Sequence, residues 1–166
     1  MKKIVLVLVL LIILISIVFL KEETVYLQAK YARDSDGTDA GDILKNINDG
    51  YEILSLKANP YGYVEISNFN FSGVPKKAYA IFEWNAYEDL GASNIYIGYS
   101  FGDVYKETGP LEAKGNRKIE IPVNIFTDFS KLKIRFRGED SDFGPDALVE
   151  VKMKLEVVKW RFAFVS

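Results

Sequence analysis

Apolar and polar residues alternate with a period of two along most of this 166-residue chain. The pattern is strictest from Ala78 to Tyr87, where apolar residues occupy the even positions and mostly polar residues the odd positions. Such alternation is typical of a β-strand with one buried and one solvated face. Because antiparallel sheets commonly keep one face wet, we predict an all-β fold, an antiparallel β-sandwich of the jelly-roll kind.

The same pattern predicts the other strands. They are expected at Val25–Ala29, Tyr51–Leu56, Tyr63–Phe71, Ile95–Phe101, Ile119–Val123, Leu132–Arg137 and Ala147–Val157. In the third of these the apolar side switches near Ser67–Asn68, which predicts a bulge. Pro122 cannot donate to a neighbouring strand, so its strand is expected at a sheet edge. In the last strand the apolar residues change from odd to even positions after Val158, so this strand should bend or divide. Asp42–Ile47 predicts one short helical turn.

Two expectations concern side-chain placement. Trp84 occupies an even position of its strand, on the same apolar side as Phe82, so it is expected in the core. Lys133, Arg135 and Arg137 occupy the polar positions of their strand, so its outer face is expected to be cationic and solvated.

A nearly uninterrupted apolar run, Ile4–Leu20, follows Met1-Lys2-Lys3. Its length is at the short limit for a helix that spans a bilayer, which needs about 17–25 residues. Since the cations precede the run, the start should remain in the cytoplasm and the rest should be exported. We therefore predict a signal anchor with a transmembrane helix at residues 1–23 and an exported domain at residues 24–166. The protein would cross the cell membrane once, with its C-terminal domain extracellular.

Two other interpretations of the start remain open. A cleaved signal peptide needs small residues before the cleavage point, and Ala29 is one, but Leu27 stands where a second is needed. A prepilin-type signal is usually cut after a small residue ahead of the apolar run, and Lys2-Lys3 supplies none. The uncleaved anchor is the interpretation we favour.

The chain contains no cysteine and no histidine. This composition removes Ser-His-Asp and Cys-His nucleophile systems and most zinc sites. Carboxylate-only enzymes, above all glycosidases, remain as an alternative. The net charge is −2, so the composition shows no excess of basic residues of the kind that binds nucleic acid. We therefore predict a protein that is not an enzyme and does not bind nucleic acid.

The polar side of the strand around Ala78–Tyr87 is the predicted ligand-binding face. It carries Tyr79, Glu83, Asn85 and Tyr87. Flat aromatic rings beside hydrogen-bonding groups suit a glycan, and exposed tyrosines also suit a protein interface. The alternative is that the tyrosines form cross-strand pairs.

Two acidic loops make a candidate structural calcium site. Their carboxylates are Asp34, Asp36 and Asp39 in the first loop and Asp140, Asp142 and Asp146 in the second. Calcium takes six to eight oxygen ligands, and distant loops of a jelly roll can meet. The EF-hand spacing is not met. The alternative is that these residues simply form surface turns.

The order of these parts resembles the galactose-binding-like jelly-roll domains of surface proteins and carbohydrate-binding modules. The stretches that carry the resemblance are Ile47–Tyr51, Val64–Phe71, Leu132–Gly138 and Asp140–Val151. The resemblance implies a β-sandwich, a structural calcium and a binding role. It identifies no ligand residue, because the binding loops of that family vary freely.

Together these features predict a non-catalytic, membrane-anchored surface protein that binds a glycan or an envelope protein neighbour. The alternative is a pilin-like or virion structural subunit that forms a homo-oligomer. Such a subunit would assemble through its apolar N-terminal helix, or by donating the strand Thr24–Tyr31 to a neighbour.

Overall fold

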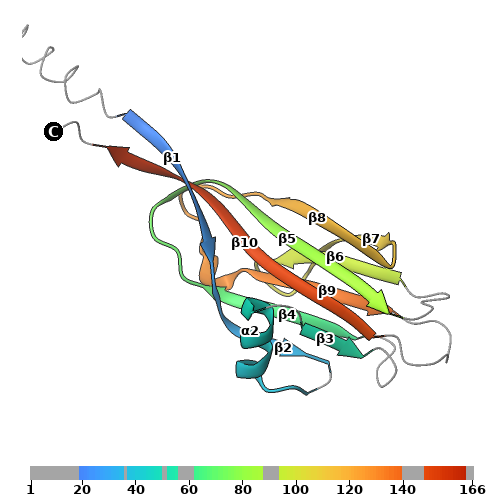
Figure 1. Cartoon of the computed structure of the whole chain (residues 1–166). Coiled ribbons are helices and arrows are strands. Elements are labelled where there is room, and N and C mark those ends of the chain that lie inside the picture. The colour runs from blue at the N-terminus through green and yellow to red at the C-terminus, as the bar shows by residue number, and fades with distance from the viewer. Residues whose placement is uncertain are drawn as a thin grey trace, which may run out of the picture.

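The computed structural model describes residues 19–35, 37–49, 52–55, 62–87, 94–139 and 148–163, which form two antiparallel sheets (Figure 1). In chain order the elements are β1 (Phe19–Leu27), β2 (Ala29–Asp34), α2 (Ala40–Asp49), β3 (Glu52–Ser55), β4 (Tyr63–Phe69), β5 (Val74–Tyr87), β6 (Asn94–Ser100), β7 (Lys106–Leu111), β8 (Lys114–Ile121), η1 (Phe129–Lys131), β9 (Lys133–Glu139) and β10 (Leu148–Ala163). The antiparallel β-sandwich that the alternation predicted is confirmed.

One sheet, here called the β10 sheet, has the strand order β1-β10-β5-β8, and β3 also pairs with β10. The other, the β9 sheet, has the order β2-β4-β9-β6-β7. β10 is 16 residues long and pairs with β5 along one edge. Its other edge pairs first with β3 and then with β1. β10 is therefore the strand that joins most of its sheet together.

The core lies between the two sheets and consists of the inward side of each alternating strand. Trp84 of β5 reaches across to Phe136 of β9, with 6.2 Å between the ring centroids. Both side chains are buried, so the prediction that Trp84 belongs to the core is confirmed. Aromatic side chains each bury a large apolar area, so this contact contributes strongly to sheet packing.

The sequence predicted two irregular points, in β4 and in β10, where the apolar side of the strand switches. Asn68 adopts a left-handed backbone conformation with φ of 60°, which Asn tolerates better than most residues. This lets the buried side pass from Ile66 to Phe69. β10 does not divide: it continues to Ala163, with a register shift in its pairing with β5 after Val158.

The helix α2 is longer than the single turn that the sequence predicted. Ile43 and Ile47 are four residues apart, so they share one face of the helix, and both are buried in the core. Asp39 begins the helix, because its carboxylate accepts a hydrogen bond from the backbone N–H of Gly41 at 2.7 Å. α2 packs mainly against β2 and thereby covers the start of the β9 sheet.

β8 pairs with β5 alone among the described strands, so it lies at the edge of its sheet, as predicted. Pro122 follows directly after β8 and does not interrupt it.

The start of the chain joins the sandwich earlier than predicted. β1 begins at Phe19 and pairs with β10 as far as Ala163, so the expected boundary between Glu23 and Thr24 lies inside a strand. Among residues 19–163, wherever the structure describes them, no helix is long and apolar enough to cross a membrane. Residues 1–18, which hold most of the predicted anchor, lie outside the described residues. The segment Thr24–Tyr31 pairs within this chain, in β1 and β2.

We predict that Phe136→Ala lowers the free energy of unfolding by about 3–5 kcal/mol, because it leaves a cavity against Trp84. Urea denaturation of the full chain in detergent measures the effect. The control is Lys154→Ala on the exposed side of β10, which should change stability by less than about 0.5 kcal/mol. Equal stability of both variants would contradict packing between the sheets at this point.

Candidate functional site

The outer face of the β10 sheet contains the residues that the sequence predicted as a ligand-binding face. Since the even-numbered residues of β5 from Ala78 to Trp84 are buried, the odd-numbered residues of this stretch point away from the core. The ladder places Glu83 beside Asn116 of β8 and Asn85 beside Glu150 of β10. The side chain of Tyr87, at the end of β5, lies outside the described part of the chain.

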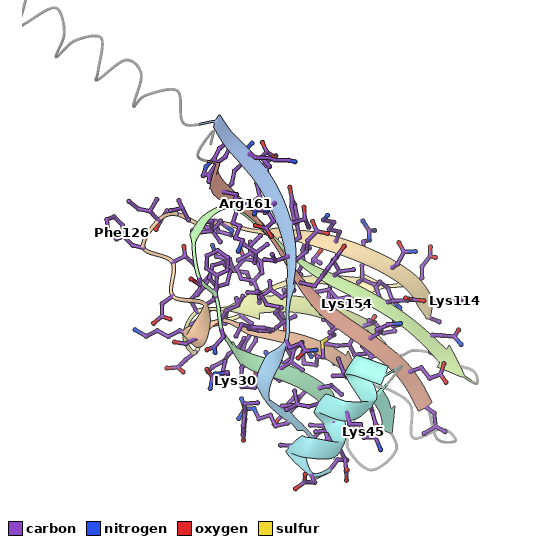
Figure 2. The ribbon with its side chains drawn as sticks, turned by 60° about the vertical axis from the view of Figure 1, so that its left-hand side comes forward. Lys30, Lys45, Lys114, Phe126, Lys154 and Arg161 are labelled. Carbon is purple, nitrogen blue, oxygen red and sulfur yellow. The ribbon has the colours of Figure 1, made fainter. Side chains whose placement is uncertain are left out.

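Glu83 and Asn85 line a hollow of about 240 Å³ at one end of this face. We call it the polar hollow and define it by Glu83, Asn85, Lys114, Asn116 and Glu150. Figure 2 labels Lys114 at the end of the molecule opposite Arg161, which lies near the end of β10. Two predicted residues, Glu83 and Asn85, are therefore brought together here with three that the sequence did not indicate.

Trp84 and Gly115 form the inner boundary of the polar hollow. Trp84 donates its indole N–H to the carbonyl of Glu112 at 2.9 Å, so its ring lies under the β7–β8 turn. A Cβ atom at Gly115 would approach the Trp84 ring to 2.8 Å, closer than side chains tolerate. The absence of a side chain at Gly115 thus allows the indole to pack directly against β8. A second hollow of about 440 Å³ adjoins the first and also includes Pro110.

The polar hollow combines three kinds of hydrogen-bonding group. Glu83 and Glu150 supply carboxylate acceptors, Asn85 and Asn116 supply amide donors and acceptors, and Lys114 supplies an ammonium donor. A ligand with many hydroxyl groups can donate to and accept from such a set, because each hydroxyl does both.

Tyr79 does not line the polar hollow. Its ring lies beneath the Lys118 ammonium, which is 4.2 Å from the ring centroid. Lys118 also pairs with Glu156 at 2.7 Å, and this hydrogen bond raises the pKa of Lys118 above its ordinary value. Tyr26 of β1 donates its hydroxyl to the same carboxylate. Tyr79 is therefore part of a cross-strand cluster, the alternative that the sequence left open.

The candidate calcium ligands in the described region serve local backbone turns. Asp34 is buried and accepts a hydrogen bond from the backbone N–H of Thr38, and Asp39 begins α2. The other predicted ligands, Asp36, Asp140, Asp142 and Asp146, lie outside the described residues. Where side chains are described, no three acidic residues are grouped to hold a metal ion. Calcium binding stays a prediction.

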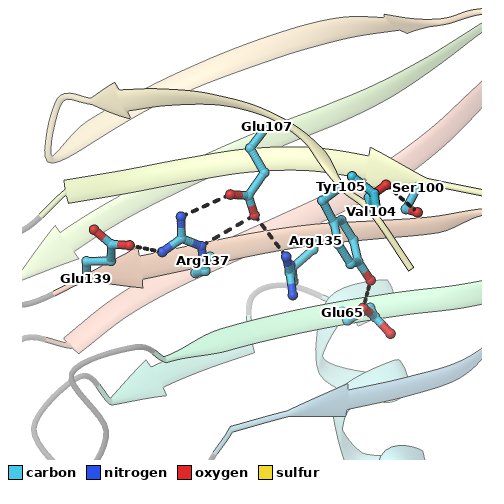
Figure 3. A network of polar contacts seen from close by, with 8 residues as sticks. All are labelled: Glu65, Ser100, Val104, Tyr105, Glu107, Arg135, Arg137 and Glu139. Carbon is cyan, nitrogen blue, oxygen red and sulfur yellow. Dashed lines mark hydrogen bonds and ion pairs between the residues drawn. The ribbon is translucent and has the colours of Figure 1, made fainter. Parts of the chain in front are cut away.

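The outer face of the β9 sheet holds a network of ion pairs (Figure 3). Glu107 of β7 pairs with Arg135 at 3.1 Å and with Arg137 at 2.9 Å, and Arg137 also pairs with Glu139. The Arg135 and Arg137 side chains are only 21% and 18% exposed. The prediction of a solvated cationic face is therefore wrong for these two residues, because Glu107 of β7 pairs with both and the Tyr105 ring lies against Arg135.

Gly98 makes this arrangement possible. It lies on β6 between Glu107 of β7 and Arg135 of β9. A Cβ atom at Gly98 would lie 2.8 Å from Cγ of Glu107. Because Gly98 has no side chain, Glu107 can extend across β6 to the arginines of β9.

Glu65, on the same face, is 2% exposed and is held by two neighbours. Arg33 donates to one carboxylate oxygen at 2.9 Å, and the hydroxyl of Tyr105 donates to the other. The Arg135 guanidinium lies 3.5 Å from the Tyr105 ring centroid. A buried carboxylate requires such partners, since burying an unpaired charge is costly. Carboxylates and guanidinium groups from β2, β4, β7 and β9 pair with one another in this network, so we assign it a structural role.

Comparison with known proteins finds no family model and no curated protein that matches this chain. The polar hollow is therefore assessed on its own geometry.

We predict that the contribution of Glu107 to stability depends on pH. Burial acts to raise the pKa of the Glu107 carboxyl, but hydrogen bonding from Arg137 and the charges of Arg137 and Arg135 outweigh it and lower this pKa below the ordinary 4.5. The unfolded chain then binds the proton more readily than the folded chain. The stabilisation is present above pH 4.5 and is lost as the pH falls through the lowered pKa.

Glu107→Gln should accordingly cost about 1–2 kcal/mol at neutral pH, and the difference from the unsubstituted chain should shrink in acid. Urea midpoints over a series from neutral to acidic pH measure it, with Glu120→Gln on the solvated side of β8 as the control. A deficit that stays constant at every pH would show that the ion pairs are not its cause.

Proposed function

We propose that this chain is a membrane-anchored surface β-sandwich without catalytic activity that binds a glycan through the polar hollow. The observation that carries the proposal is the convergence of carboxylate, amide and ammonium groups from three strands in one hollow. Sugar hydroxyls need donors and acceptors at close range, and a shallow polar site on a rigid sheet supplies them.

The position of the polar hollow supports a surface role. It lies where β10 begins, near Glu150, whereas β1 begins beside Ala163 at the other end of β10. At about 3.3 Å per residue, nearly the whole length of β10 separates the two points by roughly 40 Å. If the apolar run Ile4–Leu20 anchors the chain in a membrane, the polar hollow faces away from that membrane.

The strand order supports assignment of the sandwich as a jelly roll. Without β1 and β2, the two sheets read β3-β10-β5-β8 and β4-β9-β6-β7. From β3 to β10, each strand lies in the opposite sheet from the strand before it, except that β7 lies in the same sheet as β6. Eight strands wound in two such sheets are typical of a jelly roll. The proposed likeness to galactose-binding-like domains rests on this order together with the sequence pattern.

We predict that the full chain, in detergent, binds to at least one glycan of a glycan array. The double variant Asn85→Ala, Asn116→Ala should bind roughly tenfold more weakly or worse, since each lost hydrogen bond contributes about 1 kcal/mol. Glu120→Ala, on the same face of the sheet but outside the polar hollow, is the matched control and should bind like the unsubstituted chain.

Three results would contradict this function. Absence of glycan binding, or equal binding by the double variant, would remove the polar hollow as a sugar site and favour a protein neighbour. Release of shortened glycan from the array would instead indicate hydrolysis by the two carboxylates in the hollow.

A further inference from the structure

Two loops expose large apolar side chains at the end of the sandwich opposite the polar hollow. In the loop after β8, Ile125 is 66% exposed and Phe126 is 86% exposed. In the loop between β6 and β7, Val104 is 84% exposed, and Phe101 is partly exposed beside it. Isolated exposed apolar residues are common, but four such residues in two loops at the same end of the sandwich are consistent with an interaction site. We call Phe101, Val104, Ile125 and Phe126 the apolar tips.

The strand register places both loops at the same end. Ser100, at the end of β6, pairs with Lys133, at the beginning of β9. The loop after β8 leads through η1 into that same beginning of β9, so the two loops meet the sheet at neighbouring points. On the facing sheet, Val74 at the start of β5 pairs with Trp160 of β10. Figure 2 shows Phe126 and Arg161 at one end of the molecule and Lys114 at the other.

Hydrogen bonds fix the shape of the loop that carries Ile125 and Phe126. Asn124 accepts the N–H of Phe126 on its side-chain oxygen at 2.8 Å. Its own N–H donates to the Thr127 hydroxyl at 2.8 Å, and its carbonyl accepts the N–H of Thr127 at 3.0 Å. Turn positions usually hold Gly, Asn, Asp or Ser, so two large apolar residues at the tip of a tight turn are unusual.

The other loop is held in a similar way. The Ser100 hydroxyl donates to the carbonyl of Val104 at 2.8 Å and accepts the N–H of Gly102 at 2.9 Å. Both turns are therefore held by local hydrogen bonds while Val104, Ile125 and Phe126 remain largely exposed; Phe101 is less exposed, because its ring packs edge-on against Tyr99.

The same end of the sandwich is where the apolar N-terminal run enters the fold. That run extends from Ile4 to Leu20, and β1 begins at Phe19, opposite Ala163. Resting on the membrane anchor of the proposed function, we propose that the apolar tips insert into the interface of the bilayer that holds the N-terminal segment. Aromatic and aliphatic side chains favour the boundary between headgroups and acyl chains. The apolar tips would thus hold the domain at a fixed tilt, with the polar hollow directed outward.

The test uses the full chain reconstituted in vesicles of phosphatidylcholine and phosphatidylglycerol. The chain has no cysteine, so Phe126→Cys can carry a single nitroxide label. Lys45→Cys, on the exposed side of α2, provides the matched control (Figure 2). Collisional relaxation with dissolved oxygen and with a water-soluble nickel complex reports where each label lies. We expect the label at 126 to be more accessible to oxygen and the label at 45 to be more accessible to nickel.

A second variant guards against an effect of the label itself. Ile125→Asp in the Phe126→Cys background places a charge in the tip and should reverse the accessibility order at 126. Vesicle flotation is measured on every sample. If the protein floats but the label at 126 is as accessible to the nickel complex as the label at 45, the inference is overturned while the anchor stands. If the protein does not float, both the anchor and the inference fail. Spin–spin broadening between labels at 126 would assign the tips to contact between two copies instead.

Discussion

The antiparallel pairing of β10 with β5 is the contact on which the rest of this structure depends. These two strands form the centre of one sheet, and their inward residues, such as Phe82 and Met153, build half of the core. Because strand residues alternate between faces, the same pairing fixes the outer face. Glu150 and Asn85 meet in the polar hollow only because the register places them opposite each other. β10 also carries β1, and through it the start of the chain.

The two outer faces of the sandwich differ in how their charged side chains are arranged. On the β9 sheet, carboxylates and guanidinium groups from several strands neutralise one another over short distances, and Glu65 is buried among its partners. Such a face holds strands in register. On the β10 sheet, carboxylate, amide and ammonium groups from three strands line one hollow. This grouping around a hollow is why we place binding on the β10 sheet.

The fold was largely predictable from the sequence, whereas the site was predictable only in part. A period of two identifies strands and their buried side, which is why β5, β9 and β10 were found and Trp84 was placed correctly. The same period does not reveal which strands are neighbours. Glu83 and Asn85 could be proposed because they lie on one strand, but Lys114, on another strand, could not. The arginines of β9 were expected to be solvated because they occupy the polar positions of their strand. Alternation does not show that Glu107, 28 residues from Arg135, pairs with them.

Amide hydrogen exchange along β10 tests most directly whether this strand joins the two ends of the sandwich into one body. The amides from Val149 to Val157 lie in the ladder with β5 and should exchange together, at the slowest rate in the domain, through global unfolding. Early exchange of this segment, while the amides of β4 and β9 stay protected, would contradict the account. It would show that the polar hollow and the start of β1 belong to a sheet that opens independently.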